Sequence, residues 1–188
     1  MIKVNLFLAC SLLLCCSFAT AQMGKGDEPR SLTQIVDRSL SGVESEFVSA
    51  ADAMPEDKYS FAPTHGEFKG VRTFEQQVKH VAAVNYMIGA AIMGEKPPMD
   101  LGGENGPDSI KSKADVMKFL KDSFAYMHKA DATINAENAT GLVASPFGQG
   151  KSSRLGLATL VFGHCFDHYG QMVEYLRMNG IIPPASRH

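Results

Sequence analysis

Residues 153–180 have the sequence SRLGLATLVFGHCFDHYGQMVEYLRMNG and carry the clearest helical pattern in the chain. Its apolar residues recur at three- and four-residue steps, which predicts a long helix with one buried face over residues 153–179. That face carries Leu157, Val161, Cys165, His168, Met172 and Leu176. Gly180 is a natural residue to follow a helix end, and Pro183-Pro184 prevents the helix from continuing.

Three further segments have the same periodicity, and they run over residues 31–54, 73–93 and, from Asp108 or Ser109, to residue 135. The first apolar stripe, for example, comprises Leu32, Ile35, Val36, Leu40, Val43, Phe47 and Met54. Glycine and proline are frequent in the links 55–72, 94–107 and 138–152. No segment alternates apolar and polar residues over a length typical of a strand. We therefore expect an all-α four-helix bundle. The links are long for simple hairpins, so one of them is expected to cross over.

The N-terminal segment reads as a secretory signal peptide. Lys3 precedes an apolar run over residues 6–18, and the small-residue triplet Ala19-Thr20-Ala21 follows. Cleavage is expected before Gln22, which leaves residues 22–188 as one exported domain, periplasmic or secreted. An uncleaved membrane anchor and a lipid anchor on Cys15 are the alternatives. The apolar run is short for a bilayer span, so no stable membrane insertion is expected after cleavage.

Composition excludes some classes of function. The 188 residues include 18 basic and 20 acidic side chains, for a net charge of -2, and no basic stripe with interleaved aromatics occurs. This balance argues against nucleic-acid binding. Apolar residues make up 45% of the chain, enough for a real core. Without residues 1–21 the chain keeps only Cys165, so an internal disulfide is excluded.

The histidines carry the strongest chemical signal. His164 and His168 are four residues apart, so on a helix they face the same way and can share one metal ion. His80 lies midway along the second segment among valines. A lone histidine there would usually be a satisfied core residue, but one divalent ion shared by all three would satisfy every ring. We expect zinc, if it is the ion, at about 2.0–2.1 Å from each nitrogen. Binding would weaken as the pH falls through roughly 6.5.

Other polar residues have weaker cases. Gln171 follows His168 by three residues and could orient a ligand or a water molecule. Asp167 and Glu75 are candidate general bases, although Asp167 points about 100° away from the ligand face. Cys165 adjoins His164, but its place on the apolar stripe favours a structural thiol over a nucleophile. The remaining histidines, His65, His128 and His188, are expected to be solvated.

Three stretches resemble the DinB-like family of metal-binding four-helix bundles. They are residues 63–80 with Arg72-Thr73-Phe74 and His80, the pair His164 and His168 followed by Tyr169-Gly170-Gln171, and residues 175–184. The family's histidine pattern falls on His80, His164 and His168. The resemblance implies a zinc- or nickel-type ion, frequent homodimers and, in some relatives, transferases or isomerases that use a small cellular thiol. Small thiols are scarce outside the cytoplasm, which disfavours that chemistry for an exported chain.

Three functions follow as hypotheses. The first is a metal-dependent hydrolase or transferase acting on a small molecule, because three neutral histidines leave a coordination position open. The second is a non-catalytic metal-binding or stress-related bundle, and the third is a structural bundle with a vestigial site.

Overall fold

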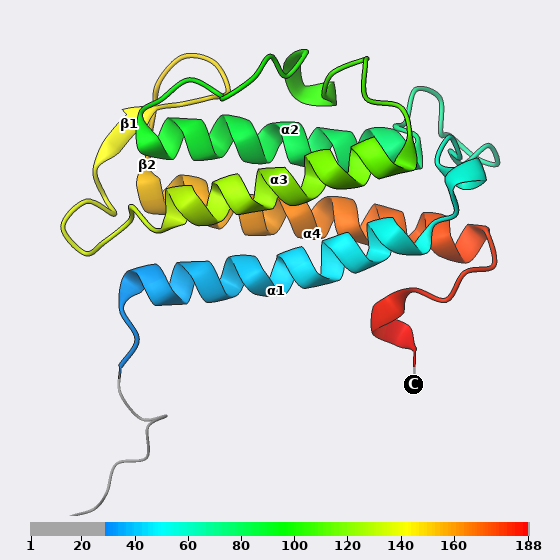
Figure 1. The fold of residues 1–188 in the computed structure, drawn as a ribbon, viewed down its shortest axis with the longest axis horizontal. Helices are drawn as coiled ribbons and strands as arrows, with labels where there is room; N and C mark the ends of the chain where they lie inside the picture. Colours follow the sequence, from blue (N-terminus) through cyan, green and yellow to red (C-terminus); the bar gives the residue numbers. More distant parts are fainter. Residues whose placement is uncertain (1–28, 188) are drawn as a thin grey trace, which may run out of the picture.

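The computed structural model describes residues 29–187. Four long helices dominate it: α1 (Leu32–Ala53), α2 (Phe74–Met93), α3 (Lys113–Asp131) and α4 (Arg154–Met178). They lie side by side as a bundle (Figure 1). The all-α four-helix prediction is therefore confirmed. The predicted signal peptide and His188 lie outside the described residues.

The connections cross the bundle. α1 packs against α3 and α4, and α2 packs against the same two helices, so α1 and α2 occupy opposite corners. α2 and α3 run in the same direction, and the segment between them returns along the whole bundle over α2 (Figure 1). The expected crossover is thus the link after α2. This link contains the short 3₁₀ turn η2 (Gly103–Asn105), which packs on α2.

Local capping sets the helix ends. Ser31 and Thr73 begin α1 and α2 with capping boxes, in which each hydroxyl accepts from the backbone N–H of Gln34 or Gln76. In return, the Gln34 and Gln76 side-chain oxygens accept from the backbone N–H of Ser31 and Thr73. The third helix begins later than its apolar stripe predicts, because the Ser112 side chain caps the Asp115 N–H. It also ends earlier, so Ile110 and Ile134 pack from the flanking segments.

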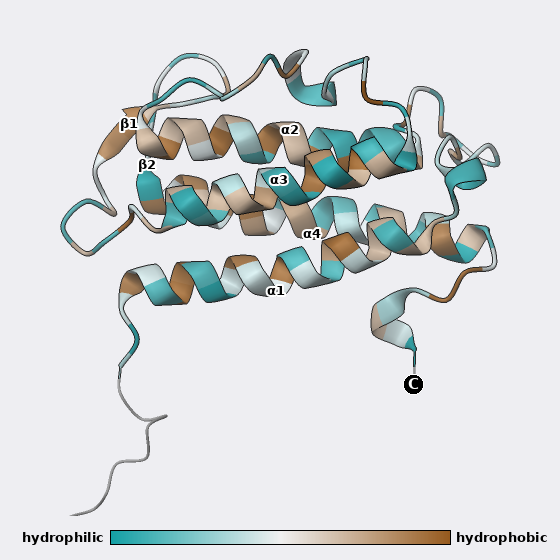
Figure 2. Ribbon diagram, in the orientation of Figure 1, coloured by the Kyte–Doolittle hydropathy of each residue, from teal (hydrophilic) through white to brown (hydrophobic). Residues whose placement is uncertain are grey.

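The core follows the predicted stripes. Every residue of the α4 stripe is buried, and Val36, Leu40, Val43, Phe47 and Met54 of the first stripe are buried too. Leu32 is half-buried, and Ile35 has 51% of its surface exposed because it points outside the contact of α1 with α3 and α4. Figure 2 shows α2 changing from hydrophilic near its start to hydrophobic toward its end. The polar half of α2 is the half that contains His80.

A small hairpin departs from the sequence prediction. Strands β1 (Leu142–Ala144) and β2 (Lys151–Ser153) pair antiparallel between α3 and α4. Three residues are too few for an alternating pattern to appear in the sequence. The turn uses Gly148 and Gly150 with positive φ values of 97° and 122°, conformations that favour glycine. Among residues 29–187, no helix is long and apolar enough to span a membrane.

Candidate metal centre

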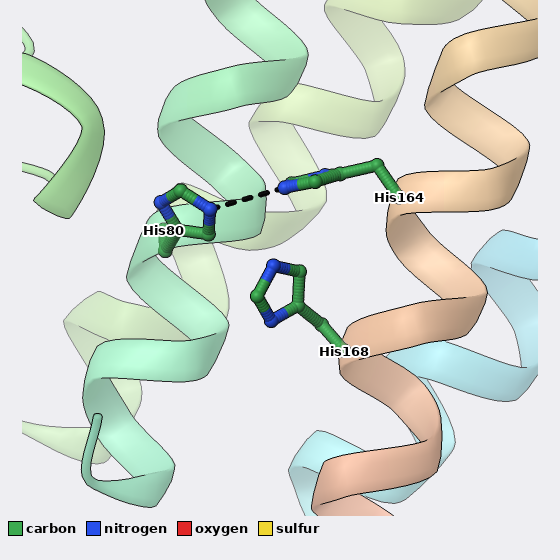
Figure 3. Close-up of side chains that lie close together, drawn as sticks. All are labelled: His80, His164 and His168. Carbon is green, nitrogen blue, oxygen red and sulfur yellow. Dashed lines mark hydrogen bonds between the residues drawn. The ribbon is translucent and has the colours of Figure 1, made fainter. Parts of the chain in front are cut away.

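His80, His164 and His168 come together between α2 and α4 (Figure 3). His80 projects from α2, and the other two project from successive turns of α4. The ring centroids are 5.0 Å apart for His80 and His164, 4.7 Å for His80 and His168, and 4.5 Å for His164 and His168. One ligand nitrogen from each ring lies within 4.8 Å of the others. The three imidazoles therefore form a compact set of nitrogen donors.

The loop over α2 fixes the His80 ring. Gly106 lies so close to α2 that an added Cβ would be 3.1 Å from the Lys79 Cβ and 3.3 Å from the Lys79 carbonyl oxygen. This approach brings the Glu104 carbonyl oxygen to 2.6 Å from His80 Nδ1. A carbonyl can only accept, so His80 Nδ1 carries the proton and Nε2 carries the lone pair. The loop thereby sets the His80 tautomer whose Nε2 lone pair is free to accept a metal ion.

A chain of side-chain amides fixes His168. The His168 Nδ1 donates to Gln77 Oε1 at 2.5 Å, Gln77 Nε2 donates to Gln171 Oε1 at 2.8 Å, and Gln171 Nε2 donates to Asp167 Oδ2 at 3.3 Å. The donors in this chain all point from the His168 ring toward the Asp167 carboxylate, and each amide oxygen accepts from the preceding group. The sequence suggested that Gln171 orients the site directly, but the structure places Gln77 between Gln171 and His168.

His164 is the third ring of the group, and it has the fewest hydrogen bonds to hold its orientation. Its Nε2 lies 3.0 Å from His80 Nε2 (Figure 3), and its Nδ1 is buried with no hydrogen-bond partner among the residues that the structure describes. Two imidazole Nε2 atoms that converge in this way fit a shared divalent ion, since nitrogen is a preferred donor for such ions. The donor set thus fits a metal.

Burial keeps the three rings neutral at pH 7. Burial, followed by the neighbouring His168 and His80, lowers the pKa of His164 to about 3. Burial also lowers the pKa of His168 to about 4, with further contributions from His80 and Arg72. For His80, burial lowers the pKa although the bond to the Glu104 carbonyl acts against it. A neutral imidazole is the form that ligates metal, so no proton has to be displaced.

Comparison with known proteins gives the family. The model of the DinB superfamily matches residues 39–172, which include all three histidines. This chain belongs to the DinB superfamily. None of the curated proteins compared with it matches.

Two solved structures share the DinB-superfamily fold with this chain. A DinB-like protein from Bacillus cereus ATCC 10987 is 14% identical, with a TM-score of 0.63, covering 80% of this chain and 95% of its own. A conserved protein from Enterococcus faecalis is 13% identical, with a TM-score of 0.62, covering 80% of this chain and 98% of its own. At these identities the likeness supports the fold alone.

The weaker candidates do not belong to the histidine group. Cys165 is fully buried with Sγ 3.8 Å from Asn85 Oδ1, and burial raises its pKa to about 12. The thiol is therefore inert, in agreement with the structural interpretation. Glu75 pairs with Lys79 at 3.6 Å, and His65 is exposed beside Thr64.

His128 is half-buried and held by two carboxylates, whereas the sequence predicted a solvated side chain. Its Nδ1 lies 2.6 Å from Asp37 Oδ1 and its Nε2 lies 2.9 Å from Glu44 Oε2, so it joins α3 to α1. Burial opposes protonation of this ring, but the two carboxylates outweigh burial and raise its pKa. The partners are 91 and 84 residues away in the chain, which no local pattern reveals.

Sequence reasoning also missed Gln77 and Glu104. Gln77 precedes His80 by three residues and was a detectable signal, because residues three apart on a helix share a face. Glu104 acts through its backbone carbonyl, which any residue type could supply. Its only sequence signal is the glycine-rich run Gly102-Gly103-Glu104-Asn105-Gly106.

Proposed function

We propose that His80, His164 and His168 bind one divalent ion, zinc or nickel, and that the protein is a metal-dependent hydrolase or transferase acting on a small molecule. The observation that carries the proposal is the convergence of three neutral imidazoles, of which His80 and His168 are buried and His164 is half-buried. Hydrogen bonds at Nδ1 orient the His80 and His168 rings. Such bonds orient metal-binding histidines in general.

The composition of the donor set favours catalysis over a closed structural site. Within residues 29–187 the metal-type group contains three histidines and no cysteine, aspartate or glutamate. Three protein ligands leave a coordination position for a substrate, whereas structural zinc sites use four protein ligands. A bound ion would supply a Lewis acid that polarises an oxygen of the substrate or of water. The chain itself holds the His168 ring through Gln77 and the His80 ring through the Glu104 carbonyl.

A turnover panel on metal-loaded protein tests this function. We expect hydrolysis of at least one class among carboxylic esters, amides and phosphate esters, or transfer of the same groups to a small alcohol or amine. His164→Ala should abolish the activity, whereas His65→Ala, which changes an exposed histidine outside the group, should preserve it. Stoichiometric metal without turnover in any class would instead support the non-catalytic metal-binding bundle.

Export is part of the same proposal. The apolar run and the Ala19-Thr20-Ala21 triplet support cleavage before Gln22 and a periplasmic or secreted product. Intact-mass spectrometry of the protein from its native compartment should find residues 1–21 absent. A full-length product retained in the membrane would contradict export by this route.

A further inference from the structure

A polar pocket of about 600 Å³ adjoins the histidine group on the side of the α2 N-terminus. Its lining includes Arg72, Gln76, Gln77, Asn105 and Gln171. Gln77 belongs to both places, because its Oε1 accepts from His168 while its side chain lines the pocket. A ligand in the pocket would therefore be one side chain away from a metal ligand. The volume suits a small organic molecule.

Arg72 is the available cation of this pocket. It is half-buried and forms no ion pair with a carboxylate of residues 29–187. Lys79 also lines the pocket, but its Nζ donates to the Ile110 carbonyl at 3.0 Å and pairs with Glu75 at 3.6 Å. Asp108 is the one carboxylate in the lining, and it is exposed. The pocket therefore keeps an unneutralised guanidinium.

The neighbouring amides present donors to the pocket. Asn105 Oδ1 accepts from Arg72 Nε at 3.3 Å, and Gln76 Oε1 accepts from the Thr73 backbone N–H at 2.9 Å. Within the side chains of Arg72, Asn105 and Gln76, the atoms without a partner in the described part of the chain are the Arg72 Nη atoms, Asn105 Nδ2 and Gln76 Nε2. All of these are N–H donors. A ligand that matches them must be rich in acceptors.

We propose that this pocket binds a carboxylate or phosphate group of an anionic small molecule through Arg72, Asn105 and Gln76. A planar guanidinium with flanking N–H donors is suited to the oxygens of either group. As a substrate assignment this inference rests on the proposed function, since the remainder of the molecule would then extend toward the histidines. Anion binding itself requires no metal.

Calorimetric titration of metal-free protein tests the pocket, with inorganic phosphate and succinate as probes and glycerol as an uncharged control. We expect at least one anion to bind and glycerol not to bind. Arg72→Gln should weaken anion binding by about tenfold or more, because it removes the charge-assisted bonds. Arg38→Gln, which removes the same charge from the exposed side of α1, should leave the affinity unchanged. Circular dichroism and the melting temperature should verify that both variants are folded.

Two further titrations separate this inference from the proposed function. His164→Ala should lose metal but still bind the anion, whereas Arg72→Gln should still load metal. If neither anion binds the wild-type protein, or if Arg72→Gln and Arg38→Gln bind as tightly as the wild type, the pocket assignment is overturned. In that case the metal assignment would be unaffected.

Discussion

Asp131 is a buried carboxyl group, and its replacement by a neutral side chain should stabilise the protein at neutral and alkaline pH but not at acidic pH. It lies at the end of α3 with no exposed surface, and neither side-chain oxygen has a hydrogen-bond partner among the described residues. Burial raises its pKa from 3.8 to about 7; nearby His128 opposes the increase and Asp37 adds to it. The pKa is raised because transferring the charged carboxylate from water into the protein interior costs free energy.

The sign and size follow from proton linkage. Above pH 3.8 the unfolded chain gives up this proton, whereas the folded chain keeps it up to about pH 7. Stability contributed by this group therefore falls as the pH rises from about 4 to about 7. The difference between 3.8 and about 7 corresponds to about 4 kcal/mol at 1.36 kcal/mol per pKa unit, an upper bound because the folded protein can relax.

The substitution Asp131→Asn retains the shape and removes the charge. Urea unfolding followed by circular dichroism, with a chelator present, should find Asp131→Asn close to wild type at pH 4 and more stable by up to about 4 kcal/mol at pH 8. Comparison of the two proteins at one pH cancels the contributions of His80, His164 and His168, which titrate in both. Asp122→Asn, an exposed carboxylate on the same helix that pairs with Lys118, should change stability by less than about 1 kcal/mol at either pH. An equal effect of Asp131→Asn at both pH values would refute the reasoning.

Three further predictions concern the metal centre and the assembly. Gln77→Ala removes the acceptor of His168 Nδ1 and should weaken metal affinity by about 10- to 100-fold without abolishing binding, as measured by competition with a chelator; an unchanged affinity would contradict the amide chain. The pKa values of His164, about 3, and His168, about 4, place proton competition with the metal well below the reference value of about 6.5. Metal affinity should therefore hold through about pH 6 and fall in more acidic buffer. A loss of metal centred at about pH 6.5 would be inconsistent with the burial of these rings. We also propose a homodimer, as the family resemblance implies, and light scattering that gives only the monomer mass would rule it out.

The helices and the histidine pattern were predictable because they depend on local spacing. The stripe from Leu157 to Leu176 and the four-residue step from His164 to His168 follow directly from helix geometry. His80 needed one more inference, that the second and fourth helices face each other. The structure brings these three side chains together.

The remaining features depend on tertiary contacts. The Glu104 carbonyl reaches His80 only because the crossover loop lies on α2, and His128 finds its carboxylates on α1. Asp131 looks like an ordinary surface residue near a helix end, yet it is fully buried. Neither the path of a loop nor the pairing of distant helix faces is encoded in a local period.

The metal content of single histidine variants tests the central claim most directly. Wild-type protein and the variants His80→Ala, His164→Ala, His168→Ala and His65→Ala are loaded with zinc or nickel, dialysed against a weak chelator and measured by elemental analysis. We predict one equivalent of metal for the wild type and for His65→Ala, and loss of most of the metal in each of the other three folded variants. A full equivalent retained by all of His80→Ala, His164→Ala and His168→Ala would contradict the account.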